Sequence, residues 1–115
     1  ALELPIDPST GLSPDRFEDA IRRCPRLKAL VTIGNFSNPL GCLVPDENKA
    51  RIVDLARKAE VVIIEDDIYS DLYFHGSRPR PFKSFDKWDC VITCGSFSKT
   101  FNPAFRVGYV ISKKY

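Results

Sequence analysis

The sequence predicts an α/β fold with a mainly parallel sheet. Segments typical of strands alternate with segments typical of helices along its 115 residues, and this order is characteristic of parallel strands joined by helical crossovers. Residues 61–64 form the run Val-Val-Ile-Ile, which is typical of a strand buried on both faces of a parallel sheet. The hydrophobic content of 43% and the charged content of 28% are those of an ordinary globular domain.

The first expected elements are a short strand and a helix. Residues 2–6 begin in an apolar-polar alternation and predict a short strand. Ser13 is the expected N-cap of a helix that begins at Pro14, because the fixed φ of proline suits the first helical position. Pro25 is expected to end this helix, since proline disrupts a helix interior.

A strand, a loop and a second helix are expected next. Residues 28–33 favour a strand, and residues 34–41, rich in Asn, Ser, Pro and Gly, favour a loop. A second helix is expected to begin near Pro45. Its inward side chains are predicted to be Ile52, Val53, Leu55 and Ala56, and its outward side chains Lys49, Arg51, Arg57 and Lys58.

The second half of the chain predicts three more strands. The strand at residues 61–64 is followed at once by three acidic residues, 65–67. Residues 71–88 form a long connection that contains two prolines. Residues 90–94 and residues 106–112 complete the predicted sheet.

The composition argues against several classes of protein. A net charge of +2 is too small to indicate binding to nucleic acid or to a membrane surface, and no apolar run approaches the ~20 residues of a membrane span. The first residues lack the basic and apolar regions of a signal peptide, and the absence of an initial Met suggests a piece of a longer chain. We therefore expect a cytoplasmic protein.

The cysteine and histidine content does not favour a metal site. The four cysteines form no C-x-x-C pair, and the chain has one histidine. Zinc sites usually combine such residues at close spacing, so no metal is predicted. Free thiols in a reducing cytoplasm are the expectation.

Three unusual segments follow predicted strands. Residues 34–41 follow the first strand of the sheet, residues 65–69 the second, and residues 95–99 the third. Ligands of open α/β sheets bind beyond the carboxyl ends of the strands. If the three strands share one sheet, its rim therefore offers an amide, a carboxylate with a phenol, and hydroxyls with an ammonium.

Each segment taken singly has an ordinary explanation. An Asn-Pro loop is usually a turn, and acids after a strand are usually solvated or cap a helix. The Ser-x-x-Lys at residues 96–99 is also the nucleophile motif of penicillin-recognising enzymes, but their Ser-Asp-Asn and Lys-Thr-Gly motifs are missing here. Glycine-rich nucleotide-binding loops are missing as well. An α/β domain without a cofactor remains an alternative.

In combination, the three segments resemble the signature of fold-type-I aminotransferases of classes I and II. Asn38-Pro39-Leu40-Gly41, then Asp66-Asp67-Ile68-Tyr69, then the stretch from Ser96 to Gly108 occur in the order and at the spacing of that family. Ala104 replaces the usual glycine of the last motif. The resemblance implies a three-layer α/β/α domain, of which residues 1–115 are a fragment of the large cofactor-binding domain, with no second domain in this chain.

The resemblance implies pyridoxal 5'-phosphate as the cofactor. Lys99 would hold it as a Schiff base and, as the catalytic residue, carry a proton between substrate and cofactor. Asp66 would keep the pyridine nitrogen protonated, and Tyr69 and Asn38 would hydrogen-bond the 3-hydroxyl oxygen. Burial of Lys99 beside Arg106 would favour the neutral amine that attacks an aldehyde.

The phosphate group requires donors and positive charge. The resemblance assigns this role to Ser96 and Arg106, and to Ser98, for which helix capping is an equal alternative. Glu65 and Asp67, which flank the aspartate of the motif, are expected to be structural, as caps or as partners of nearby basic residues.

Two functional classes share such a site. Residues 35–41, 45–49, 65–73, 78–81 and 96–100 resemble the MocR type of GntR transcriptional regulators, in which an aminotransferase-like domain senses a ligand. The alternative is a free-standing amino-acid aminotransferase. In either case the resemblance implies an amino-acid or amine ligand and a homodimer. DNA would be bound only through a domain absent from this chain, and the fragment alone is expected to show no transaminase activity.

Overall fold

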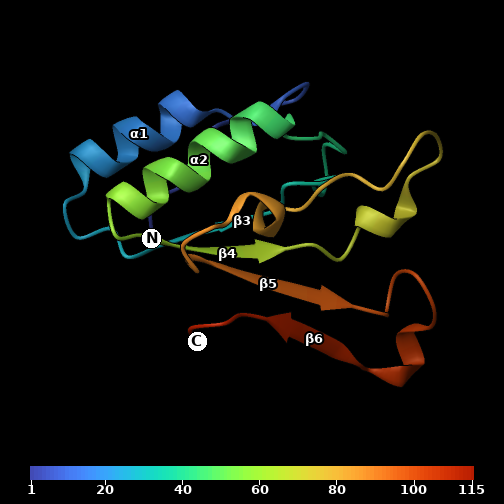
Figure 1. The fold of residues 1–115 in the computed structure, drawn as a ribbon. Coiled ribbons are helices and arrows are strands. Elements are labelled where there is room, and N and C mark those ends of the chain that lie inside the picture. The colour runs from blue at the N-terminus through green and yellow to red at the C-terminus, as the bar shows by residue number, and fades with distance from the viewer.

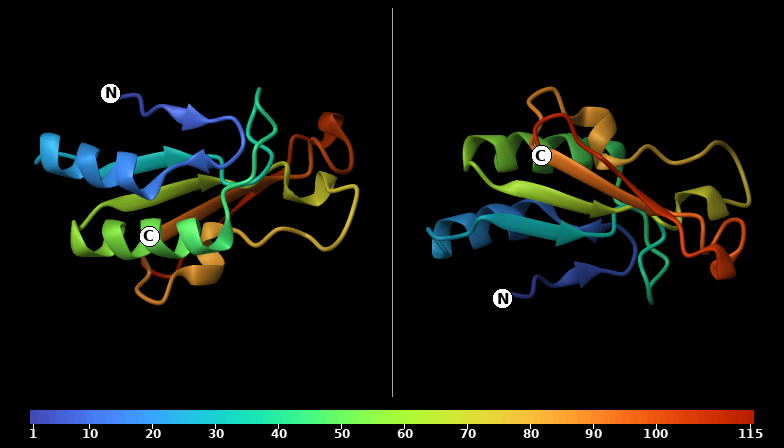
Figure 2. Two further views of the ribbon diagram at one scale, coloured as in Figure 1. Left: turned by 90° about the horizontal axis from the view of Figure 1, so that it is seen from above. Right: turned by 90° about the horizontal axis from the view of Figure 1, so that it is seen from below.

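The computed structural model describes residues 1–115 and contains a four-stranded sheet with two helices against it (Figure 1). The strand order is β3 (Ala29–Thr32), β4 (Val62–Asp66), β5 (Val91–Ser96) and β6 (Gly108–Ile111). The first three strands are parallel and β6 is antiparallel to β5; Figure 2 shows the arrows of β3 and β4 pointing the same way. The predicted α/β class with a mainly parallel sheet is confirmed.

Helix α1 (Pro14–Arg23) has the predicted start. The Ser13 hydroxyl accepts a hydrogen bond from the Asp15 backbone N–H at 3.2 Å, and proline occupies the first turn. The helix ends at Arg23, with Cys24 as its C-cap directly before Pro25. Its buried side is formed by Pro14, Phe17 and Ala20.

Helix α2 (Asp46–Lys58) also begins where the sequence predicted, with Pro45 as its N-cap. Ile52, Val53 and Ala56 are fully buried, whereas Leu55 is only partly buried. The predicted outward direction of Lys49 is wrong, because its side chain is 1% exposed. Lys49 precedes Ile52 and Val53 by three and four residues, which puts it on the buried face of the helix.

The two helices cover one face of the sheet. Leu30, Ile63 and Val91 lie in register on adjacent strands and share a core cluster with Phe17 of α1 and Ile52 of α2. On the opposite face, burial is lower: side chains of β4 alternate between buried and half-buried, and Val31 of β3 is 71% exposed. The expected burial of residues 61–64 on both faces is therefore not reached within this chain, which forms two of the three expected layers.

The amino-terminal strand is displaced from its predicted place. Residues 2–5 are not in a strand; β1 (Ile6–Asp7) instead pairs antiparallel with β2 (Gly11–Leu12). The Asp7 carboxylate accepts hydrogen bonds from the backbone N–H groups of Ser9 and Thr10 at 2.8 and 2.9 Å. This Asx-type turn closes a tight hairpin, and its chemistry decides the position of the strand more than the alternation of residues 2–6 does.

The long connection between β4 and β5 contains two short 3-10 helices, η1 (Ser70–Leu72) and η2 (Phe82–Phe85). A third, η3 (Pro103–Phe105), lies in the loop between β5 and β6. Neither α1 nor α2 has the length and the apolar sequence needed to cross a membrane. All four cysteines are free.

One carboxylate stabilises the entry to β5. Asp86 accepts hydrogen bonds from the backbone N–H groups of Trp88, Cys90 and Val91 at 3.0 to 3.2 Å and from Lys83 Nζ at 2.8 Å. Burial alone would raise the pKa of Asp86, but these four donors outweigh it and lower the pKa from 3.8 to about 2.

The depressed pKa of Asp86 predicts a pH-dependent loss of stability. The carboxylate stabilises the fold above the unfolded-state pKa, and this contribution is lost as the pH falls from 3.8 towards about 2. At about 1.4 kcal/mol per pKa unit, Asp86→Asn should lower the free energy of unfolding of the full-length protein by about 2 kcal/mol at neutral pH. Urea titrations should show the two proteins converging in acid; a difference that does not depend on pH would contradict this origin.

Candidate functional site

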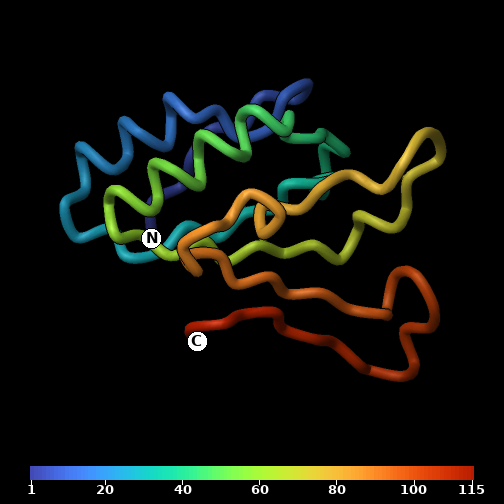
Figure 3. Tube along the Cα trace, in the orientation of Figure 1, coloured from blue at the N-terminus to red at the C-terminus, as the bar shows by residue number.

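The three predicted segments do meet at one rim of the sheet. Because β3, β4 and β5 are parallel and in register, with Thr32 beside Glu65 and Glu65 beside Thr93, their carboxyl ends share one edge. Figure 3 shows the connections that follow these strands at the same end of the molecule. The sheet thus places segments that are far apart in sequence, such as residues 34–41 and 95–99, at one edge.

Asp66 is the last residue of β4, on the sheet face opposite to α1 and α2. Its neighbour Glu65 points to the helix side and is fully buried, whereas Asp66 is half-buried. Among the buried side-chain oxygen and nitrogen atoms of residues 1–115, Asp66 Oδ1 alone has no hydrogen-bond partner. Leaving a buried carboxylate oxygen unpaired is costly, so this atom is suited to accept a hydrogen bond from a ligand.

Asn38 lies in the loop after β3, the strand that pairs with β4. It is exposed, and its peptide bond to Pro39 is cis. Asn38 and Asp66 both line a hollow of about 690 Å³, whose other walls are mostly apolar side chains of β3 and the amino-terminal segment. This volume lies within the range of small-molecule sites. Tyr69 does not line the hollow; it is half-buried at the start of η1.

Ser96 and Ser98 form a compact pair of hydroxyls after β5. Ser96 Oγ accepts the Ser98 backbone N–H at 3.1 Å and lies 3.0 Å from Ser98 Oγ. It also lies 3.2 Å from the carbonyl oxygen of Val107. Since the Phe97 N–H bonds to that same carbonyl, the turn at residues 96–98 is held beside Arg106, the residue before Val107. Arg106 has a left-handed backbone, with φ 52°.

Lys99 and Arg106 are both exposed. The expected burial of Lys99 beside Arg106 is therefore wrong for this chain. The physical reason is the position of residues 99–111, all of which are exposed, at the edge of the sheet where no other segment of the 115 residues covers them. In the structure, Asn38 and Asp66 line one hollow, and the two serines lie in one turn. Lys99, the next residue after Ser98, is exposed to solvent.

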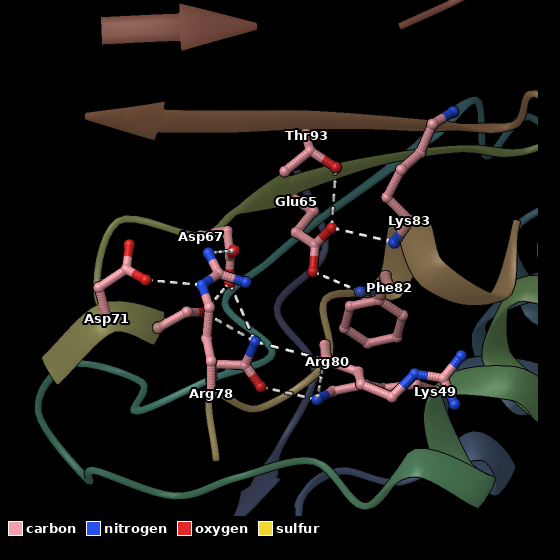
Figure 4. A network of polar contacts seen from close by, with 11 residues as sticks. Lys49, Glu65, Asp67, Asp71, Arg78, Arg80, Phe82, Lys83 and Thr93 are labelled. Atoms are coloured by element: carbon pink, nitrogen blue, oxygen red, sulfur yellow. Dashed lines mark hydrogen bonds and ion pairs between the residues drawn. The ribbon is translucent and has the colours of Figure 1, made fainter. Parts of the chain in front are cut away.

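A buried polar network lies beneath the rim (Figure 4). Lys49 Nζ donates to Asn35 Oδ1 and to the carbonyl oxygen of Arg80, both at 2.6 Å. Asn35 Nδ2 donates to Asp67 Oδ1 at 2.9 Å and to Ser70 Oγ at 2.8 Å. The Ser70 hydroxyl also donates to Asp67 Oδ1. The four side chains Asn35, Lys49, Asp67 and Ser70 are at most 4% exposed.

Arg78 closes this network towards solvent. Its guanidinium donates to Asp67 Oδ2 at 2.9 Å and to Asp71 Oδ1 at 2.7 Å. Burial lowers the pKa of Arg78, but the two carboxylates outweigh burial and raise it. The side chain of Asp67, 3% exposed, therefore has a charged partner.

Glu65 belongs to a second buried set. Its carboxylate accepts the backbone N–H groups of Phe82 at 2.5 Å and Lys83 at 3.2 Å, and the Thr93 hydroxyl at 2.9 Å. Burial raises the pKa of Glu65, against the effect of these donors. Glu65 thus caps η2, and Asp67 pairs with Arg78, so the prediction that both flanking acids are structural is confirmed.

Sequence reasoning missed the members of the polar network other than Asp67. Lys49 had a usable signal, because its spacing of three, four and seven residues from Ile52, Val53 and Ala56 placed it on the apolar side of α2. Asn35 and Ser70 carried no such signal, since their burial depends on side chains from distant parts of the chain. No group of three or more His, Cys, Asp or Glu side chains is arranged to hold a metal ion.

Comparison with known proteins places this geometry in a family. The sequence model for aminotransferases of class I and II matches residues 3–114. The HTH-type transcriptional regulator YjiR of Escherichia coli is 40% identical over 99% of this chain and 24% of its own length. Aromatic-amino-acid aminotransferase 1 of Thermococcus litoralis is 29% identical over 99% of this chain and 28% of its own.

Solved structures agree with the sequence comparison. The multiple substrate aminotransferase of Thermococcus profundus superimposes with a TM-score of 0.91 and 31% identity, over 98% of this chain and 29% of that one. The chain thus spans about a quarter of the length of the proteins that it matches. The predicted resemblance to regulators and to aminotransferases is confirmed, and the chain belongs to the class I and II aminotransferase family.

Proposed function

We propose that residues 1–115 are part of a domain that binds pyridoxal 5'-phosphate, with Lys99 as the residue that holds it as a Schiff base. The observation that carries the proposal is the unpaired, buried Oδ1 of Asp66 at the carboxyl end of β4. A protonated ring nitrogen is a donor of the right charge for this oxygen. Membership of the aminotransferase family supports the choice of cofactor.

The residues around Asp66 fit the ring of this cofactor. Asn38 lines the same hollow and offers an amide N–H to the 3-hydroxyl oxygen, and Tyr69 offers a phenol. When bound, the cofactor supplies an aldehyde for the lysine amine and a ring that withdraws electrons from a substrate. Asp66 would hold the proton on the ring nitrogen, and Asn38 and Tyr69 would stabilise negative charge on the 3-hydroxyl oxygen.

The loop after β5 fits the phosphate group. The Ser96 and Ser98 hydroxyls are 3.0 Å apart and would donate to phosphate oxygens. The Arg106 guanidinium can bind two such oxygens with its planar fork. Lys99 lies one residue beyond Ser98, so an amine and a phosphate-binding turn occupy the same short loop. As the catalytic group, Lys99 would carry the proton between the bound ligand and the cofactor.

We further propose that the whole protein is a transcriptional regulator of the MocR/GntR type, in which this domain senses an amino acid or amine. The 40% identity to an HTH-type regulator over 99% of the chain supports this choice. DNA would be bound by a domain outside these residues, and the protein would act as a homodimer. The alternative is an amino-acid aminotransferase, which is supported by the 31% identity to the Thermococcus profundus enzyme structure.

Absorption spectroscopy of the full-length protein separates these two functions. The protein is saturated with cofactor, and its visible band is followed as single amino acids and then 2-oxo acids are added. A sensor should show one shift that a 2-oxo acid does not reverse and that produces no new amino acid. If the 2-oxo acid restores the original band and a new amino acid forms, the protein is an aminotransferase, and the proposal of a regulator is wrong.

A further inference from the structure

We infer that Lys49, acting through Asn35, positions the three residues assigned to the cofactor ring. Asn35, Lys49, Asp67, Ser70 and Arg78 are named here the Lys49 network (Figure 4). None of the five is among the proposed cofactor contacts, so the inference concerns residues that hold others in place. It rests on the proposed function, since positioning is measured on the bound cofactor.

The network joins the segments that carry the ring contacts. Asn35 lies three residues before Asn38 in the loop after β3. Asp67 directly follows Asp66, and Ser70 directly follows Tyr69. The amide group of Asn35, in the loop after β3, bonds to both Asp67 and Ser70 in the loop after β4. A displacement of one loop relative to the other therefore breaks these hydrogen bonds.

Lys49 fixes the orientation of that amide. Its Nζ donates to Asn35 Oδ1 at 2.6 Å, which leaves Asn35 Nδ2 to face Asp67 and Ser70. If the amide were reversed, its NH2 group would meet the ammonium, and its oxygen would meet the carboxylate of Asp67. Both contacts would be repulsive. Lys49 also donates to the carbonyl oxygen of Arg80 and so holds the segment leading to η2.

The burial of Lys49 is itself informative. Buried lysines are rare because the ammonium must leave water, and burial lowers the pKa of Lys49 while the carboxylates of Asp46, Glu65 and Asp67 oppose that shift. Lys49 reaches from α2, a rigid helix anchored in the core by Ile52 and Val53. Helix α2 therefore acts as a fixed support for two otherwise irregular loops.

A purely structural role makes a different prediction from a positioning role. If the network only stabilises the fold, a variant that still folds should bind the cofactor as the wild type does. If it positions the ring contacts, the variant should fold but bind more weakly, because small displacements of positioned groups are costly, up to about 10²-fold for about 1 Å. The positions of the Asp66 carboxylate and the Tyr69 phenol relative to the ring would change too, and with them the pH dependence of the visible band.

The test compares Lys49→Met with Lys58→Met in the full-length protein. Both changes remove one ammonium from α2, but the Lys58 side chain is 62% exposed and pairs only with Asp54. For Lys49→Met we expect pyridoxal 5'-phosphate to bind roughly 10-fold to 100-fold more weakly and its visible band to titrate at a different pH. Without cofactor, amide hydrogen exchange should accelerate in residues 34–41 and 66–72. Lys58→Met should match the wild type in each measurement.

Each outcome decides the inference. A folded Lys49→Met protein with wild-type affinity, band titration and hydrogen exchange would overturn it, while leaving cofactor binding by the wild type intact. If Lys49→Met does not fold, Ser70→Ala decides, because it removes one hydroxyl from the network: weaker binding with a shifted band titration supports the inference, and wild-type values overturn it. Failure of the wild type to bind the cofactor would instead refute the proposed function.

Discussion

Replacing Lys99 by alanine is expected to abolish the visible absorption of lysine-bound cofactor in the full-length protein. No other side chain lies in the same loop as the Ser96 and Ser98 pair and also carries a primary amine. The cofactor can still enter by way of its phosphate and ring contacts, but it cannot form the covalent bond. If the protein turns over, loss of proton transfer alone should lower the rate by roughly 10²–10⁴-fold.

The matched control for Lys99→Ala is Lys113→Ala. Lys113 is also exposed and also follows a strand at the edge of the sheet, β6. Its replacement should leave the absorption unchanged. If the Lys99→Ala protein keeps the visible band, and borohydride reduction links the cofactor covalently to the protein, another lysine holds the cofactor.

The second large effect is expected from Asp66→Asn, which should weaken cofactor binding without lowering the stability of the protein. The carboxylate is the proposed partner of the ring nitrogen, and removal of one such electrostatic contact typically costs about 10²–10³-fold in rate. Without cofactor, the same change relieves the cost of burying the unpaired Oδ1. We therefore expect weaker binding and slower ligand-driven spectral change, but an unfolding midpoint without cofactor that is unchanged or higher.

The neighbouring carboxylate supplies the control for Asp66→Asn. Asp67 bonds to Asn35, Ser70 and Arg78, so Asp67→Asn should destabilise the protein even without cofactor. Truncating one partner of such a buried network typically costs about 3–5 kcal/mol. Thermal melts without cofactor should thus show a lower midpoint for Asp67→Asn but not for Asp66→Asn. If Asp66→Asn melts as low as Asp67→Asn, the Asp66 carboxylate supports the fold rather than a ligand.

The parts of the fold that were predictable depend on local chemistry. The start of α1 followed from the Ser13 cap and Pro14, and the shared rim followed from the parallel strands. The displacement of the first strand had a local cause as well, since the Asp7 side chain makes a turn with Ser9 and Thr10. The residues of that turn can be recognised in the sequence, but a strand predicted from the alternation of apolar and polar residues alone does not take them into account.

The errors at the site come from contacts between distant segments. The buried Lys49 ammonium is hydrogen-bonded to Asn35, 14 residues away, and to the carbonyl oxygen of Arg80, 31 residues away. The local sequence around Lys49 does not predict these two acceptors. Lys99 is exposed because residues 1–115 provide no cover for the loop after β5. The order and type of the motif residues were readable from the sequence. Of the network beneath them, only the buried side of Lys49 was readable, and its partners were not.

Borohydride trapping on the full-length protein tests the proposed cofactor site most directly. The protein is incubated with pyridoxal 5'-phosphate, reduced with borohydride, digested and mapped by mass spectrometry. A single stoichiometric label on Lys99 is the result expected. A label distributed over surface lysines, or confined to a lysine other than Lys99, would contradict it.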